Sequence, residues 1–187
     1  MILSFREIID VAVMTVIVGY IFMDLFRFHK EEIITGFDWQ GLKFACLVTA
    51  PALIFHELSH KFVALAYGLE ATFHAAYTWL GFGIILKLLH TGFIFFVPAY
   101  VSIGCATQPC NLEPLSMSAI AVAGPAANLL IFLICLLLLK YAKLSRTTRI
   151  ILYITKQINL FLFIFNMLPI PGFDGFKVYQ GLWKAFF

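Results

Sequence analysis

Four stretches of the sequence are apolar over almost the full length that a helix needs to cross a membrane. They run from Phe5 to Phe26, Leu42 to Tyr67, Ala119 to Leu139 and Ile150 to Leu168. A membrane-spanning helix takes about 20 predominantly apolar residues, and 62% of this chain is hydrophobic while 12% is charged. The pattern predicts an all-α polytopic protein of the cell membrane, with about four transmembrane helices surrounded by the lipid bilayer.

The segment from Gly68 to Ser118 fits this scheme less well. It contains WLGFGIILKLLH, which predicts a short helix, and then TGFIFFVPAYVSIG from Thr91 to Gly104, which has the β-branched and aromatic composition of strands. Unpaired strand backbone cannot face lipid. We therefore expect a re-entrant or interfacial insert with short β-strands, and a fifth helix from Leu80 to Pro98 is the alternative. Since no linker or repeat divides the chain, residues 1–187 are predicted to form a single membrane-embedded domain.

The charged residues and the cysteines add weaker constraints. The formal net charge is +3 and the sequence has no block of basic residues, which excludes nucleic acid as a partner. Asp10 and Asp24 lie near the ends of the first apolar stretch, so we expect both to reach the headgroup region. Cys105 and Cys110 flank a Gln-Pro turn and could form a disulfide only on an oxidising side of the membrane.

The sequence HELSH, from His56 to His60, places three polar side chains inside an apolar stretch. Residues four apart share one face of a helix, so the two imidazoles can bind one ion. Glu57 lies beside them and can accept a proton from a metal-activated water. The motif also arises by chance on soluble helices, but polar groups at membrane depth are costly without a partner. The sequence therefore predicts a zinc site here.

A catalytic zinc usually has three protein ligands, and Asp174 is the best candidate for the third. It lies in FNMLPIPGFDGF, where Pro169, Pro171 and Gly172 must interrupt the fourth helix. Broken backbone at membrane depth is tolerated where it lines a cavity, and there it could bring a carboxylate to a metal. The alternative is an ordinary Asp-Gly turn where the helix leaves the membrane.

Together these two motifs resemble the site-2 protease family of intramembrane zinc metalloproteases. The signature of that family is HExxH on one membrane helix and N-x-x-P-x-x-x-x-D-G on a later one, which here are HELSH and NMLPIPGFDG, the latter from Asn166 to Gly175. AGPAAN, from Ala123 to Asn128, is similar to the Gly-Pro-containing helix between them, and VPAYVSIG is similar to the family's strand-forming stretch. The resemblance covers Leu42 to about Val178.

The resemblance implies Zn²⁺ held by His56, His60 and Asp174, with Glu57 as the general base. It implies regulated intramembrane proteolysis, in which a peptide bond within a transmembrane protein substrate is hydrolysed. Asn166 occupies the family's asparagine position and would face the scissile carbonyl or the oxyanion that forms from it. A hydrogen bond in helix packing is an equally good interpretation of Asn166 from the sequence.

Other polar and small residues in the chain have simpler interpretations. Gly124, Pro125 and Asn128 favour close helix packing rather than chemistry. His74 and His90 lie in the insert and are expected to be interfacial histidines rather than metal ligands. The competing function is a catalytically inactive metal-binding membrane protein, either a substrate-binding relative or a transporter component. The sequence leaves open whether copies of the chain form a homo-oligomer.

Overall fold

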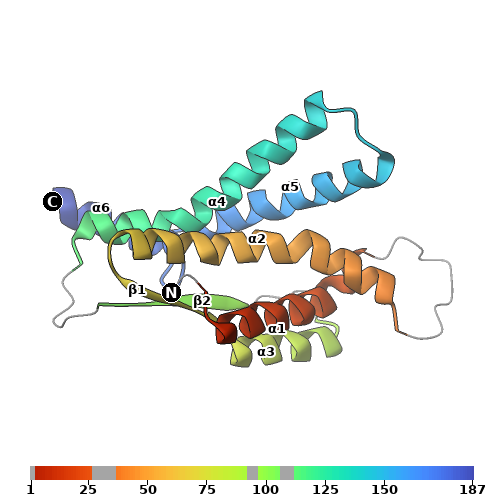
Figure 1. The fold of residues 1–187 in the computed structure, drawn as a ribbon, viewed down its shortest axis with the longest axis horizontal. Helices are drawn as coiled ribbons and strands as arrows, with labels where there is room; N and C mark the ends of the chain where they lie inside the picture. The colour runs from red at the N-terminus through yellow and green to blue at the C-terminus, as the bar shows by residue number, and fades with distance from the viewer. Residues whose placement is uncertain (1–2, 27–36, 92–96, 106–111) are drawn as a thin grey trace. The chain divides into compact units, whose positions relative to one another are not determined.

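The computed structural model describes residues 3–26, 37–91, 97–105 and 112–187. Figure 1 shows helices joined to one small sheet, and the elements in chain order are α1 (Phe5–Phe22), η1 (Met23–Phe26), α2 (Trp39–Ala66), β1 (Glu70–Ala75), α3 (Tyr77–Leu88), β2 (Ala99–Gly104), α4 (Pro114–Tyr141), α5 (Arg146–Asn166) and α6 (Asp174–Phe186). Among these described residues, four segments are long and apolar enough to span a membrane: α1 with η1, α2, α4 and α5. The predicted fold class, all-α and polytopic with short strands, is confirmed.

Capping residues explain where several helices begin. Ser4 and Glu7 form a reciprocal capping box at the start of α1, with Glu7 N 3.3 Å from Ser4 Oγ and Ser4 N 2.7 Å from Glu7 Oε2. Ser145 caps α5 by accepting from Thr148 N at 3.1 Å. Because Ser145 satisfies a backbone donor of the first turn, α5 begins at Arg146 rather than at the predicted Ile150.

The segment between α2 and α4 contains a short helix and two antiparallel strands. At 12 residues, α3 extends about 18 Å, well short of the roughly 30 Å of hydrocarbon. The alternative of a fifth helix from Leu80 to Pro98 is therefore wrong, because α3 ends at Leu88. The predicted strand from Thr91 to Gly104 is confirmed from Ala99 onward, while residues 92–96 lie outside the described residues.

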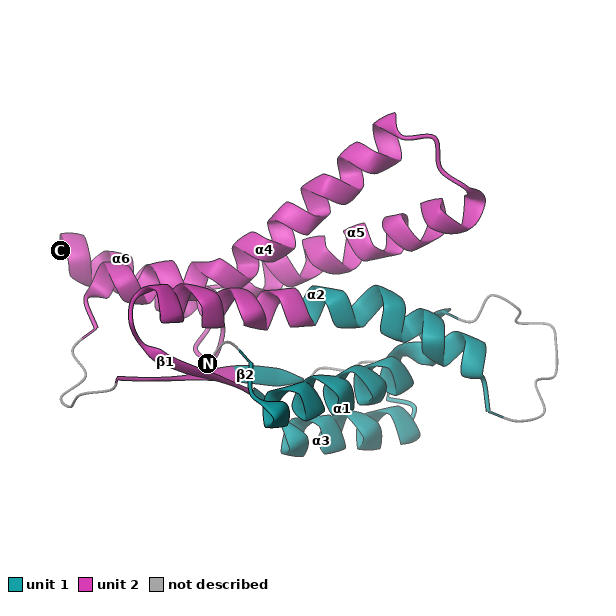
Figure 2. Ribbon diagram, viewed as in Figure 1, with its two compact units in different colours: residues 1–53, 74–100 teal, residues 54–73, 101–187 magenta. Residues whose placement is uncertain are grey.

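The described chain forms two compact units, shown in Figure 2. Unit 1 comprises residues 1–53 and 74–100, and unit 2 comprises residues 54–73 and 101–187. Residues of α2 contribute to both units, as do residues of each strand. The single domain of residues 1–187 stays a prediction. The pairing of Cys105 with Cys110 also stays a prediction, because Cys110 lies outside the described residues.

Polar contacts attach α3 to α1 within unit 1. Asp10 is 3% exposed and accepts a hydrogen bond from the Tyr77 hydroxyl at 2.5 Å, so it is paired within the protein, while its depth relative to the headgroups stays a prediction. Asp24 instead forms an ion pair with Lys87, whose Nζ lies 2.8 Å from Asp24 Oδ2. An acidic group within a membrane helix needs a partner, and α3 supplies one to each of these two residues.

In unit 2, α4 packs against both α5 and α6. Ser118 on α4 is buried and donates from Oγ to the Val178 carbonyl on α6 at 3.0 Å. A Cβ atom at Gly181 would collide with Ser118 Oγ and lie 2.5 Å from the Pro114 carbonyl oxygen. The glycine therefore permits the close approach of α6 to α4, as small residues do between membrane helices.

Candidate metal centre

Two imidazoles project from one face of α2 in unit 2. His56 and His60 are one helical turn apart, are 6% and 7% exposed, and have ring centroids 4.8 Å apart. Their Nε2 atoms lie 3.2 Å from each other. The i, i+4 spacing predicted from HELSH thus places both nitrogens where a single ion can bind them.

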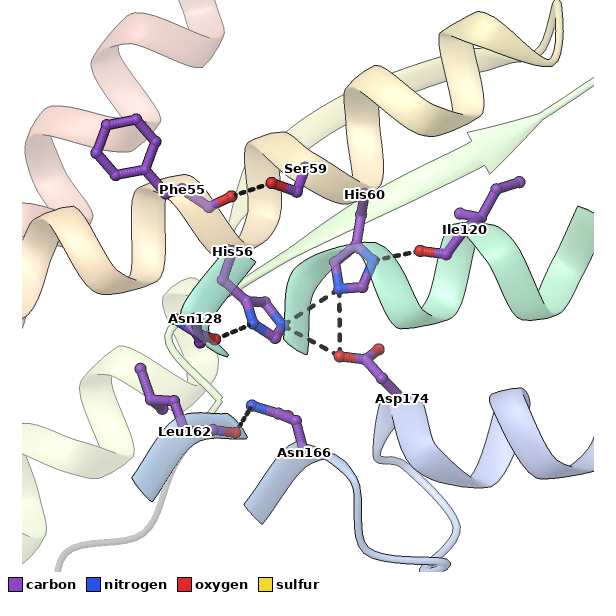
Figure 3. Close-up of polar contacts among 9 residues, drawn as sticks. All are labelled: Phe55, His56, Ser59, His60, Ile120, Asn128, Leu162, Asn166 and Asp174. Atoms are coloured by element: carbon purple, nitrogen blue, oxygen red, sulfur yellow. Dashed lines mark hydrogen bonds and ion pairs between the residues drawn. The ribbon is translucent and has the colours of Figure 1, made fainter. Parts of the chain in front are cut away.

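Asp174 is the first residue of α6 and reaches both histidines (Figure 3). Its Oδ2 lies 3.0 Å from His56 Nε2 and 3.2 Å from His60 Nε2. Gly172 adopts a φ of 101° in the preceding loop, a conformation that costs glycine little. A Cβ atom at Gly175 would lie 2.5 Å from the Met167 carbonyl carbon, so the glycine after Asp174 lets α6 begin against the end of the preceding helix.

The three candidate ligand atoms have a spacing that suits zinc. A tetrahedral zinc ion with bonds of about 2.0–2.1 Å needs ligand atoms about 3.3 Å apart, and the observed separations are 3.0, 3.2 and 3.2 Å. Burial alone would raise the pKa of Asp174, but the facing imidazoles of His56 and His60 hold it below its ordinary value. Asp174 is therefore ionised at neutral pH and can act as an anionic ligand.

The outer nitrogen of each imidazole also has a partner. His60 Nδ1 lies 2.7 Å from the Ile120 carbonyl oxygen, and His56 Nδ1 lies 2.6 Å from Asn128 Oδ1. A backbone carbonyl only accepts, so Nδ1 of His60 carries a proton, and in the neutral ring Nε2 is then the nitrogen with a lone pair. Such contacts to the outer nitrogen are the usual support of metal-binding histidines.

Gly124 on α4 lies against the two imidazoles. A Cβ atom at this position would collide with His60 Nε2 and would lie 2.7 Å from His56 Nε2. The missing side chain therefore faces the same two nitrogens that converge on Asp174. We predicted close packing for Gly124, and the structure shows that the closely packed neighbours are the two imidazoles.

Glu57 follows His56 on α2 and is half-buried. It interacts electrostatically with His56, His60 and Asp174. Its carboxylate thus belongs to the same charged cluster without being one of the three residues whose ligand atoms converge. This placement suits a group that exchanges protons near a metal rather than one that binds it.

Asn166 ends α5 and is drawn near the cluster in Figure 3. Its Nδ2 donates to the Leu162 carbonyl of its own helix at 3.0 Å. A side-chain amide has two N–H groups, so this bond leaves a second donor on the same nitrogen. Among the described residues, the hydrogen bond of Asn166 is to its own helix, and both the oxyanion and the packing interpretations stay predictions.

The remaining polar residues that the sequence singled out lie in different settings. His74 stacks on Tyr100, with ring centroids 5.3 Å apart, and His90 is exposed beside the Leu88 carbonyl. Neither belongs to the group of three possible ligands found among the described residues. Asn128 was expected only to permit packing, but its hydrogen bond to His56 makes it part of the site. An amide four residues after Gly124, within an otherwise apolar stretch, was the available signal in the sequence.

Comparison with the sequences of known proteins shows which family the chain belongs to. The chain is 38% identical over 182 residues to "Putative zinc metalloprotease MJ0611" of Methanocaldococcus jannaschii, covering 88% of this chain and 90% of that protein. Relatives of the same designation are YwhC of Bacillus subtilis, at 30% identity over 68% of this chain, and sll0528 of Synechocystis, at 29% over 85%. The matches span 63% and 36% of those two proteins.

No family model matches the chain, and no solved structure matches it. The identity to the Methanocaldococcus protein extends over nearly the whole of both chains. It agrees with a histidine and aspartate cluster whose spacing fits zinc. The chain therefore belongs to the zinc metalloprotease family that these relatives share.

Proposed function

We propose that the chain is an intramembrane zinc metalloprotease of the site-2 protease type. It would hydrolyse a peptide bond within or near a transmembrane segment of a membrane-protein substrate in the lipid bilayer. The observation that carries this proposal is the convergence of His56, His60 and Asp174, two of which lie inside a helix apolar enough to span a membrane.

The depth of the histidines along α2 supports cleavage within the membrane. His56 lies roughly ten residues before the end of the helix at Ala66, which corresponds to about 15 Å of helical rise. The hydrocarbon core is about 30 Å thick. If α2 spans the bilayer with both ends near its surfaces, a peptide bond that reaches these ligands would lie at membrane depth, where the available substrates are transmembrane segments.

The residues of the site have distinct tasks in the proposed reaction. Zinc bound by the three ligands would lower the pKa of a bound water towards neutrality and polarise the peptide carbonyl. The Glu57 carboxylate would accept a proton from the attacking water and deliver it to the nitrogen of the leaving amine. The second N–H of Asn166 would donate to the oxygen of the scissile carbonyl as negative charge develops on it.

The small sheet offers a way to hold an unwound substrate. Among the described residues the sheet contains only β1 and β2, so each strand has one edge without a strand neighbour. β2 follows Pro98 and is largely exposed beyond Ala99. An extended peptide can add to such an edge through main-chain hydrogen bonds. We propose that β2 binds substrate in this way and replaces the bonds that the substrate helix loses on unwinding.

A cleavage assay with purified protein in lipid vesicles tests this function. The substrate is a peptide with a single transmembrane segment and is incubated with the wild-type protein, with and without a zinc chelator. We expect cleavage that the chelator abolishes. Glu57→Gln should bind zinc and fail to cleave, because the amide cannot accept the proton.

Glu113→Gln is the matched control for this change. Glu113 is exposed and makes no capping hydrogen bond with its side chain, so the same substitution there should leave cleavage intact. Wild-type protein that holds zinc but cleaves no membrane peptide would favour the inactive metal-binding function. Undiminished cleavage by Glu57→Gln would remove this residue from the reaction.

A further inference from the structure

We infer that two buried asparagines, Asn128 on α4 and Asn159 on α5, are positioning residues that fix which nitrogen of His56 carries its proton. The hydrogen bonds run from His56 through both amides to a backbone carbonyl of α5. Donors and acceptors can be assigned along these hydrogen bonds in only one consistent way. In the neutral imidazole this assignment leaves the lone pair on the nitrogen of His56 that faces Asp174.

The direction is set at the α5 end of the chain of hydrogen bonds. Asn159 Nδ2 lies 2.8 Å from the Thr155 carbonyl oxygen. A backbone carbonyl only accepts hydrogen bonds, so the amide nitrogen of Asn159 has to face it. The two ends of an asparagine amide are alike in shape, but here the carbonyl distinguishes them. The Oδ1 atom of Asn159 must therefore face α4.

The same argument then passes to Asn128. Its Nδ2 donates to Asn159 Oδ1 at 2.9 Å, which leaves Asn128 Oδ1 facing His56 Nδ1 at 2.6 Å. An amide oxygen only accepts, so Nδ1 of His56 must carry the proton. In the neutral ring Nε2 of His56 then has the lone pair that metal ligation by this nitrogen requires.

Burial indicates that these amides do more than fill space. Asn128 and Asn159 are both 0% exposed, and Asn159 is the buried residue of α5. Both lie in helices long and apolar enough to span a membrane, where polar side chains are costly and mark function. A role in helix packing would account for the hydrogen bond between the two asparagines. It would not account for the orientation of both amides, which places an amide oxygen against Nδ1 of His56.

The second histidine of the site provides an internal comparison. His60 Nδ1 is held by the backbone carbonyl of Ile120 at 2.7 Å, so no side chain sets its proton. Substitutions at Asn128 or Asn159 should therefore affect His56 and leave His60 unchanged. A general loosening of α4 and α5 would instead affect both histidines.

This inference depends on the proposed ligation of zinc by His56, and the two ideas can fail separately. If His56→Ala retains full zinc affinity, the proposed ligand set is wrong. If His56→Ala loses zinc while the asparagine substitutions leave zinc affinity unchanged, the ligand set stands and the role of the asparagines is refuted.

The experiment measures zinc affinity by competition with a chelator, together with nitrogen-15 spectra of labelled histidines in the zinc-loaded full-length protein. Asn128→Leu should lower zinc affinity about 10- to 100-fold, the usual effect of losing a hydrogen-bond partner of a metal-bound histidine. Asn159→Leu should lower it by on the order of 10-fold, because the Asn128 amide can then rotate. In both variants the Nδ1–H signal of His56 should lose its protection from solvent exchange, while that of His60 keeps it.

Two further variants keep the test decisive if a leucine substitution prevents folding. Asn128→Asp retains an oxygen that accepts from His56 Nδ1 and should keep zinc affinity close to that of the wild type. Thr49→Val is the matched control, because Thr49 is also buried on α2 and bonds only the Ala45 carbonyl of its own helix. Unchanged zinc affinity and unchanged His56 protection in Asn159→Leu would overturn the inference, as would an equal loss of protection at His56 and His60.

Discussion

Replacing Gly124 with alanine should separate the folding of unit 2 from the binding of zinc. The added methyl group would collide with His60 Nε2 and would lie 2.7 Å from His56 Nε2. These are the two nitrogens that face Asp174, so the methyl group would compete with the ion for the same space. The rings cannot easily withdraw, because Ile120 and Asn128 hold their outer nitrogens.

The size of the effect follows from the cost of overpacking. Inserting a methyl group into a closely packed site typically costs about 1–3 kcal/mol, and each 1.4 kcal/mol is about tenfold in affinity. Since the clash is worst when the rings are held on the ion, we expect zinc affinity to fall roughly 5- to 140-fold. In the zinc-free protein no metal bond adds to the restraint on the rings, and alanine stabilises a helix by about 1 kcal/mol over glycine, which offsets part of the clash.

The assay is competition for zinc with a chelator, alongside thermal unfolding of the zinc-free protein in detergent. Gly81→Ala is the matched control, because Gly81 lies in α3 and a Cβ atom there meets nothing within 4 Å. We expect Gly81→Ala to leave zinc affinity unchanged, and Gly124→Ala to lower it without a large loss of zinc-free stability. Wild-type zinc affinity in Gly124→Ala would refute the argument that this glycine provides room for the metal.

Three further outcomes test the remaining parts of the site. Asp174→Ala should lower zinc content from about one ion per chain as measured by elemental analysis, and full occupancy would exclude this carboxylate as a ligand. Asn166→Ala should reduce turnover by about 10²–10³-fold, the cost of one oxyanion donor, with zinc content and thermal stability nearly unchanged; a collapse of stability would indicate a packing role. Tyr100→Pro removes a backbone N–H donor from β2 and should slow cleavage. A substrate with a Gly or Asn pair at midspan should be cut faster than the same substrate with Leu there. Equal cleavage of both substrates, unaffected by the proline, would show that unwinding does not depend on β2.

The sequence alone determined the features that depend on neighbouring residues. Long apolar runs predicted the four candidate membrane helices, because helix formation and membrane insertion depend on the local succession of side chains. The four-residue spacing of His56 and His60 predicted their shared face for the same reason. The motif around Asp174 made a third ligand expected, although an ordinary Asp-Gly turn remained the alternative from the local pattern alone.

Only the tertiary structure decided which distant groups meet. Asp174 lies 118 positions after His56 in sequence, and its Oδ2 is 3.0 Å from the imidazole. Asp10 was expected at the headgroups, but burial against Tyr77 changes its environment. Asn128 looked like a packing residue because nothing local reveals that His56 lies on one side of it and Asn159 on the other. A hydrogen bond depends on position and direction in space, so the proton on His56 is specified by three helices together and by no one of them.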